Sequence, residues 1–90
     1  MENIGNMKQL HNYKLSYKIK KLTKEQRQEL KVLYNRLKFY KVYQKNSTLF
    51  VKVFANVHCF SLDNKGNIMG WYIYGTLLEF YRKFKGVKLQ

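Results

Sequence analysis

Residues 49–74 read LFVKVFANVHCFSLDNKGNIMGWYIY, and this stretch decides the fold. Leu49 to Phe60 is rich in Val and Phe, which are typical of β-strands, and predicts one long strand. Asp63-Asn64-Lys65-Gly66 follows as a tight turn, because Asp bonds to the turn backbone and Gly accepts a positive φ. Ile68 to Tyr74 predicts a returning strand, so the stretch is expected to form a hairpin.

Towards the N-terminus, a helix and a strand are expected before this hairpin. Thr23 to Gln26 has the pattern of a capping box, in which the Gln side chain reaches back to the Thr backbone. Apolar residues then recur with helical spacing, which predicts a helix to about Gln44. Residues 13–20 alternate apolar and polar side chains and predict a strand with one Lys-lined face. Residues 1–12 show no such pattern and are expected to be an irregular N-terminal arm.

Towards the C-terminus, Thr76-Leu77-Leu78-Glu79 is a second capping box and predicts a short helix. Residues 87–89 suit a last short strand. The expected order is therefore β-α-β-β-α(-β), a single α+β domain over residues 1–90. Two helices would pack on one face of a small antiparallel sheet, in a layout that resembles the ferredoxin-like fold.

Composition limits the class of protein. The 90 residues are 46% hydrophobic and 17% aromatic, which argues against a disordered chain. Cys59 is the only cysteine, so no disulfide is expected within the chain, and no metal-ligand spacing occurs. No apolar run approaches the ~20 residues of a membrane span, and no signal peptide is recognised. We expect a cytoplasmic protein without cofactor or metal.

Net charge is the strongest functional signal. The chain has 18 Lys and Arg against 5 Asp and Glu, a net charge of +13. Such a balance is typical of proteins that bind nucleic acid, an anionic membrane or an acidic protein. No helix combines a basic side with a free bulky apolar side, so a membrane is not an expected partner. A Lys-rich composition from an AT-rich genome is the alternative, although it would also raise the number of Glu.

The basic residues concentrate in the first half, where a helix running to Gln44 would align five cations on one side. Such a row suits a phosphate backbone, and a merely solvated helix face is the alternative. Lysines of the predicted strand would extend the surface. The predicted nucleic-acid-binding residues are Lys14, Lys18, Lys20, Lys21, Lys24, Arg27, Lys31, Lys38, Lys45, Phe50, Lys52 and Phe54.

Two apolar surfaces also suggest binding. In a single strand from Leu49, one face would present Phe50, Lys52, Phe54, Asn56, His58 and Phe60. That face could stack unpaired bases, as the sheet of RNA-recognition motifs does, although their RNP1 pattern is absent; otherwise it is core. Val32, Phe39 and Tyr43 would form a second apolar strip on the helix. The strip either packs under the N-terminal arm or forms a partner or homodimer surface.

Catalytic residues are sparse. The few carboxylates are scattered, which disfavours a metal-dependent nuclease; Glu25 and Glu29 share a helix face but would mainly offset neighbouring Lys. A metal-free ribonuclease would need an acid, a base and cations, for which His58, Tyr72, Arg82 and Lys52 are candidates. In length and charge the chain is similar to messenger-RNA-cleaving toxins of the RelE type, although none of their motifs occurs in it. Cys59, in an apolar strand, is expected in the core.

The sequence therefore predicts a small, basic, non-enzymatic nucleic-acid-binding protein. Lys outnumbers Arg 15 to 3, which favours backbone contact over base reading, because Lys acts as a point charge. One alternative is an inhibitor from a phage or mobile element, similar in kind to anti-CRISPR proteins, that binds a nucleic-acid enzyme or its RNA or DNA complex. The other alternative is the ribonuclease toxin.

Overall fold

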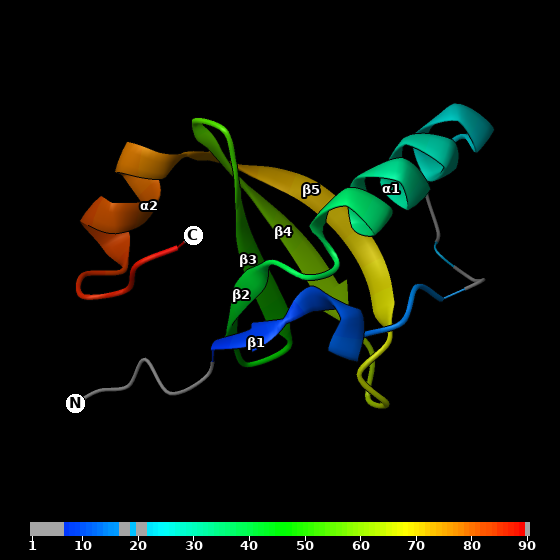
Figure 1. The fold of residues 1–90 in the computed structure, drawn as a ribbon, viewed down its shortest axis with the longest axis horizontal. Helices are drawn as coiled ribbons and strands as arrows, with labels where there is room; N and C mark the ends of the chain where they lie inside the picture. Colours follow the sequence, from blue (N-terminus) through cyan, green and yellow to red (C-terminus); the bar gives the residue numbers. More distant parts are fainter. Residues whose placement is uncertain (1–6, 17–18, 20–21, 90) are drawn as a thin grey trace.

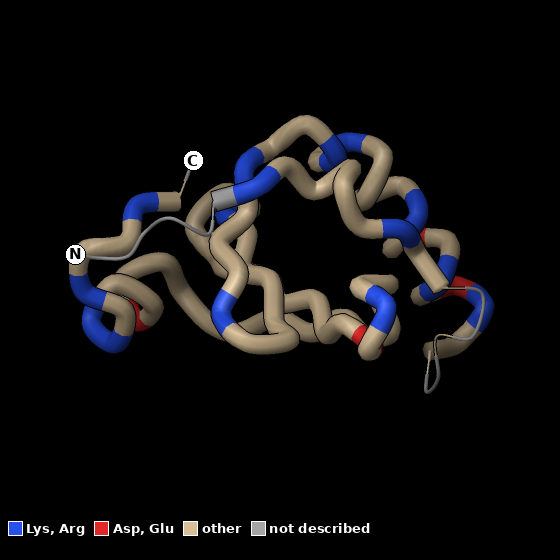
Figure 2. The backbone as a smooth tube through the Cα atoms, turned by 90° about the horizontal axis from the view of Figure 1, so that it is seen from below, with Lys and Arg blue, Asp and Glu red and all other residues tan. Residues whose placement is uncertain are grey.

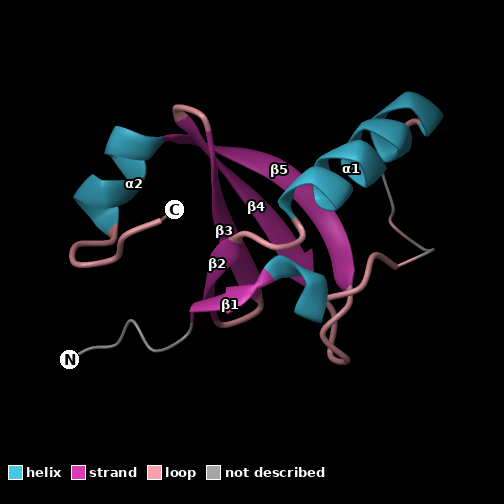
Figure 3. Cartoon of the chain, viewed as in Figure 1, coloured by secondary structure: helices cyan, strands magenta, loops and turns pink. Residues whose placement is uncertain are grey.

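The chain forms one antiparallel sheet and two α-helices in the computed structural model, which describes residues 7–16, 19 and 22–89 (Figures 1 and 3). The five strands pair in chain order, each with the next, from β1 at one edge to β5 at the other. The α+β class is confirmed. The elements are β1 Met7–Gln9, the 3-10 turn η2 Leu10–Asn12, α1 Lys24–Leu37, β2 Lys41–Lys45, β3 Thr48–Val53, β4 Asn56–Leu62, β5 Ile68–Thr76 and α2 Leu77–Lys83.

The expected element order was wrong. A ferredoxin-like sheet needs crossovers that place sequence-distant strands side by side, whereas here only β1 and β2 have a helix between them. Residues 7–9 of the expected irregular arm pair with β2 as an edge strand, and residues 1–6 lie outside the described part. Residues 87–89 form no strand, although Val87 and Leu89 are buried.

The predicted first strand is also absent from the described residues of its range. Leu15 makes an isolated parallel bridge to Ile68, with one hydrogen bond on each side of it: Ile68 donates to the carbonyl of Lys14, and the Ser16 amide donates to that of Ile68. Tyr13 and Ile19 are nevertheless buried. The alternation therefore predicted which side chains are buried, while the described residues of the range make only an isolated bridge and no strand. The rest of the range, residues 17, 18 and 20, is not described.

Both capping boxes are confirmed. The amide of Gln26 donates to Thr23 Oγ1 at 3.0 Å, and the amide of Thr23 donates to Gln26 Oε1 at 2.9 Å. Thr76 and Glu79 make the same reciprocal pair at the start of α2. These caps satisfy amides that have no partner inside the helix, so local chemistry sets both helix starts.

Helix α1 ends at Leu37 rather than near Gln44. The amide of Tyr40 donates to the carbonyl of Leu37 at 2.8 Å and turns the chain into β2. Strand β2 pairs with β1 on one side and β3 on the other, so residues 41–45 gain two ladders by leaving the helix. Sequence periodicity reports only which side chains share a face, so it cannot report the pairing with β1, which is distant in the chain.

The predicted long strand from Leu49 to Phe60 is in fact a hairpin. Val53 pairs with Asn56, which leaves Phe54 and Ala55 as a two-residue turn, with Phe54 at φ 56°. Such turns normally contain Gly, Asn or Asp, because the left-handed region strains other residues. The turn also reverses the side-chain alternation, so Val51 lies opposite His58 and Phe50 opposite Cys59. The second hairpin is confirmed: Asp63 accepts from the amides of Lys65 and Asn67, and β5 begins at Ile68.

The two helices cover opposite faces of the sheet, so the expectation that both lie on one face was wrong. Neighbouring residues of β3 point to different cores: Leu49 packs with Leu30 of α1, and Phe50 packs with Phe80 of α2. Figure 1 shows α1 and α2 at opposite ends of the molecule. We call the α1 side the first core and the α2 side the second core. Each helix therefore packs on its own face of the sheet. The two long sides of α1 remain accessible.

Candidate nucleic-acid interface

One long side of α1 borders a groove rich in cations. The groove has a volume of about 560 Å³ and lies between α1 and the residues Leu15, Ser16 and Ile19. Among the described residues, no carboxylate lines this groove. Its apolar side chains include Leu15, Ile19 and Leu30, and its basic side chains are Lys24, Arg27 and Lys31. We call it the basic groove. Its three cations span about 10 Å of helix axis, so a row of phosphates fits along it.

The predicted helix stripe is shorter than expected because α1 ends early. Lys38 is the C-cap of α1, and its Nζ lies 5.4 Å from the centroid of the Phe39 ring. Lys45 belongs to β2, with its Nζ 5.1 Å from the ring of Phe84 beside the second core. Neither lines the basic groove. Lys14 is exposed and directly precedes Leu15, which lines this groove. Lys18, Lys20 and Lys21 lie outside the described residues.

The predicted aromatic sheet face does not form, since the turn at Phe54 reverses the alternation. Phe50 is buried in the second core, and Phe60 is buried in the first. Lys52 and Phe54 remain close to one another in a smaller groove of about 370 Å³, where Arg36 and Tyr40 join them. Phe54 is 82% exposed at the tip of the hairpin.

The predicted apolar strip of Val32, Phe39 and Tyr43 does not form, because α1 ends at Leu37 and the three residues lie on different elements. Val32 is on α1 and is 49% exposed, while Phe39 lies in the loop after α1 and is 67% exposed. Tyr43 is on β2 and packs against Phe50 and Phe84 in the second core. A strip that needs a continuous helix to Gln44 does not exist.

The other long side of α1 borders a groove that the sequence did not predict. It has a volume of about 530 Å³ and combines carboxylates, a cation and an aromatic pair: Glu25, Glu29, Val32, Arg36, His58 and Trp71. We call it the Trp71 groove. Gln28 lines both this groove and the basic groove, so the two meet across the helix at that residue. Only the hairpin register could have revealed that His58 and Trp71 lie on adjacent strands of one face.

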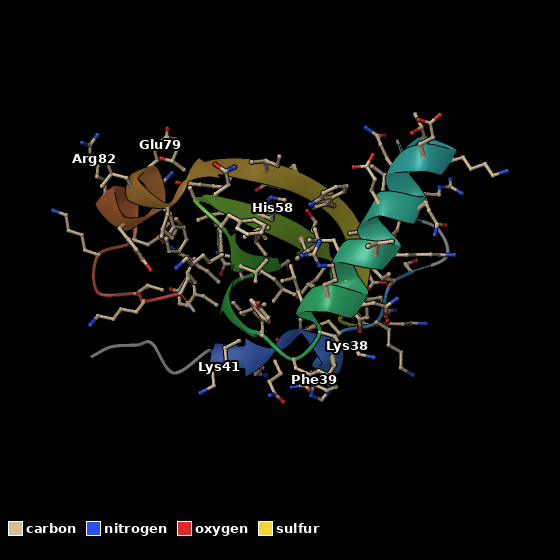
Figure 4. The ribbon with its side chains drawn as sticks, turned by 45° about the horizontal axis from the view of Figure 1, so that its top comes forward. Lys38, Phe39, Lys41, His58, Glu79 and Arg82 are labelled. Atoms are coloured by element: carbon tan, nitrogen blue, oxygen red, sulfur yellow. The ribbon has the colours of Figure 1, made fainter. Side chains whose placement is uncertain are left out.

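His58 and Trp71 are joined by a hydrogen bond. The indole Nε1–H donates to His58 Nδ1 at 3.1 Å, and the two rings are nearly parallel, with centroids 5.9 Å apart. Burial lowers the pKa of His58 from its ordinary value, so the ring is neutral near pH 7. A neutral imidazole with an accepting Nδ1 has its proton on Nε2. Figure 4 shows His58 between the two helices.

The residues suggested for a ribonuclease are not brought together. His58 lies on the α1 side, whereas Tyr72 contacts Cys59 on the other side of the sheet. Arg82 is exposed on α2. Cys59 is fully buried in the second core, and burial raises the pKa of its thiol, so it is a core residue as expected.

Metal, membrane and family comparisons add no assignment. Within the part of the chain that the structure describes, no three metal-binding side chains gather, and no helix has the length and apolar character to cross a bilayer. A scan of protein-family models, a search of curated proteins and a search of solved structures gave no match.

Proposed function

We propose that this protein is a non-enzymatic nucleic-acid-binding protein whose basic groove contacts the phosphate backbone. The observation that supports it most is the groove itself, where Lys24, Arg27 and Lys31 lie together on one side of α1 without a carboxylate among the described lining residues. A groove of this kind within a chain of net charge +13 fits a polyanion.

Phosphate contact explains both the charge and the residue type. Each neutralised phosphate releases condensed counterions, and this release supplies the free energy of backbone binding. Lys is more frequent than Arg, and Lys offers a point charge rather than a bidentate fork for base edges. Few carboxylates oppose this charge along the chain, as Figure 2 shows. We therefore expect the basic groove to position a strand without selecting its sequence.

A salt series of binding tests this proposal. Labelled single-stranded RNA, duplex RNA and duplex DNA are titrated with the protein at several salt concentrations, and both affinity and strand cleavage are recorded. We expect binding to at least one of them that weakens steeply with salt and leaves the strands intact. Weak binding to all three would contradict the proposal, and cleavage would support the ribonuclease.

A matched pair of variants locates the site. Lys24→Gln/Arg27→Gln/Lys31→Gln removes three cations from the basic groove, and Arg82→Gln/Lys83→Gln/Lys85→Gln removes three exposed cations around α2. Both variants have the same net charge. We expect the groove variant to reduce the steepness of the log–log salt plot by about 2–3 and the α2 variant to change it much less. Equal effects would show that the charge acts without a defined site.

A second candidate function is binding to a protein that acts on nucleic acid, or to its RNA or DNA complex. Large exposed apolar side chains favour it: Phe39 is 67% exposed, Phe54 82% and Leu78 62%. Aromatic anchors of this kind are typical of protein interfaces. A pull-down with immobilised protein, with and without nuclease treatment, separates direct protein contact from contact through a bound strand.

A further inference from the structure

The Trp71 groove contains a buried hydrogen-bond donor that has no acceptor among the described residues. His58 is 8% exposed, and its Nδ1 accepts from Trp71, which leaves the proton on Nε2. Among the residues that the structure describes, none accepts a hydrogen bond from this Nε2–H. Buried donors are almost always paired, because leaving one unpaired is costly. An acceptor that enters the groove would therefore be stabilised beside His58.

The walls of the groove suit a flat ring. Trp71 is half-buried, so part of its indole surface faces the groove, and Val32 on α1 is 49% exposed there. The volume of about 530 Å³ lies within the range of about 300–1,000 Å³ that is common for ligand pockets. Aromatic side chains of this kind stack on nucleobases, since every base has a π-face.

The polar groups of the groove are mixed rather than of one sign. Glu25 and Glu29 accept hydrogen bonds and repel a phosphate, while Arg36 donates and repels an ammonium group. A ligand that fits must be flat, close to neutral, and equipped with both donors and acceptors along its edge. Nucleobases meet all of these conditions.

We propose that the Trp71 groove takes one unpaired nucleobase. The base stacks on Trp71, and an acceptor on its edge accepts a hydrogen bond from His58 Nε2–H. An amino or imino group of the base donates a hydrogen bond to Glu25 or Glu29. This inference rests on the proposed function, because the phosphate of the same strand would lie in the basic groove across α1, where Gln28 borders both grooves. It predicts a preference for single strands, whose bases are free to leave the stack.

Intrinsic fluorescence tests the inference directly, because Trp71 is the only tryptophan of the chain. A short single-stranded RNA of mixed sequence is compared with an abasic phosphodiester strand of the same length, and fluorescence anisotropy of an end label reports binding of each. We expect the RNA to quench Trp71 and to bind about ten-fold more tightly than the abasic strand, as one stacked base would allow.

The two proposals fail in different ways. Equal binding of both strands without a change in Trp71 fluorescence would overturn the base site and leave backbone binding intact. Absence of binding in the anisotropy assay would overturn the proposed function and the base site with it. Quenching of Trp71 by a Lys- and Arg-rich peptide, and not by RNA, would assign the groove to a protein and overturn the base site.

Charge variants sharpen the test. Glu25→Gln/Glu29→Gln removes repulsion, so a protein that contacts only phosphates should bind both strands more tightly and by the same factor. A base site instead predicts that the preference for RNA over the abasic strand falls about five-fold, because charged acceptors become neutral ones. Glu79→Gln, which removes one negative charge, is the control on α2, where Gln can still form the capping box, as Gln26 does. This control should leave the preference unchanged, and an equal fall in both variants would overturn the site.

A histidine variant completes the experiment. His58→Phe keeps a ring in the groove and removes both the Nε2–H and the Nδ1 that accepts from Trp71. We expect the RNA preference to fall several-fold while anisotropy still reports binding of the abasic strand. If this variant does not fold, the wild-type comparison and the carboxylate variants still decide the question.

Discussion

The two grooves beside α1 differ in chemistry although one helix forms a wall of both. The basic groove contains Lys24, Arg27 and Lys31, whereas the Trp71 groove contains Glu25 and Glu29, which are two of the five acidic residues in the chain. Helical geometry explains the separation, because residues three or four apart share a side and adjacent residues do not. Two surfaces of different charge therefore lie on opposite sides of one helix in a chain whose net charge is +13.

The largest expected effect comes from removing the contact that holds α1 on the sheet. Leu30 is 1% exposed in the first core, so Leu30→Ala should destabilise the fold by about 2–5 kcal/mol. Urea denaturation measures the loss. Because α1 is a wall of both grooves, RNA binding and the quenching of Trp71 should weaken together. Retention of both with a large loss of stability would show that the grooves do not depend on the seating of α1.

Two charge reversals on the same chain should differ. Lys31 lines the basic groove and Lys38 caps α1 outside it. We expect Lys31→Glu to weaken RNA binding about ten-fold at ~0.1 M salt and Lys38→Glu about two- to three-fold. Anisotropy titrations measure both, with circular dichroism as a check on folding. Binding unchanged by Lys31→Glu would mean that the groove is not the phosphate site.

Loss of the α1 cap should affect both grooves mildly. Thr23 Oγ1 accepts from the amide of Gln26, and Thr23→Ala removes that bond. We expect a cost of about 1 kcal/mol in the free energy of unfolding. Thr76→Ala removes the equivalent cap of α2 and is the matched control. A similar loss of stability in both variants, with weaker RNA binding only in Thr23→Ala, would confirm that the first turn of α1 contributes to the site.

The smallest expected effect is the dependence of stability on pH. It concerns the Trp71 groove, because His58 lines that groove and does not line the basic groove. Burial lowers the pKa of His58 in the folded state, so below its ordinary value near 6.5 the unfolded chain binds a proton that the folded chain does not. Stability should therefore fall as pH falls from about 6.5 and level off below the folded pKa. His58→Phe should remove this part of the profile.

The carboxyl groups lose their contributions at lower pH. Backbone hydrogen bonds lower the pKa of Asp63 and of Glu79, so these groups stabilise the fold above their ordinary pKa values and cease to do so in stronger acid. Urea midpoints measured between about pH 5 and 7, compared between the wild type and His58→Phe, therefore isolate the part of the profile that depends on His58. A flat wild-type profile in that range would contradict the burial of a neutral ring in the Trp71 groove.

Sequence alone determined the features that depend on neighbouring residues. Both capping boxes and the Asp63 turn follow from hydrogen bonds between groups a few residues apart. The alternation of residues 13–19 correctly identified Tyr13 and Ile19 as buried, because burial follows from apolar side chains on one side of an extended chain.

Tertiary structure decided where α1 ends and how β3 continues. The helical pattern runs on past Leu37, yet pairing with β1 and β3 makes residues 41–45 a strand. Phe54 and Ala55 have no turn signature, and they form a turn because β4 pairs back on β3 over its whole length. That turn places His58 on the α1 side with Trp71, while Phe50 faces the second core. The Trp71 groove exists only in the folded chain, since strand pairing brings His58 and Trp71 together beside α1, whereas the basic groove forms where Leu15, Ser16 and Ile19 lie against α1.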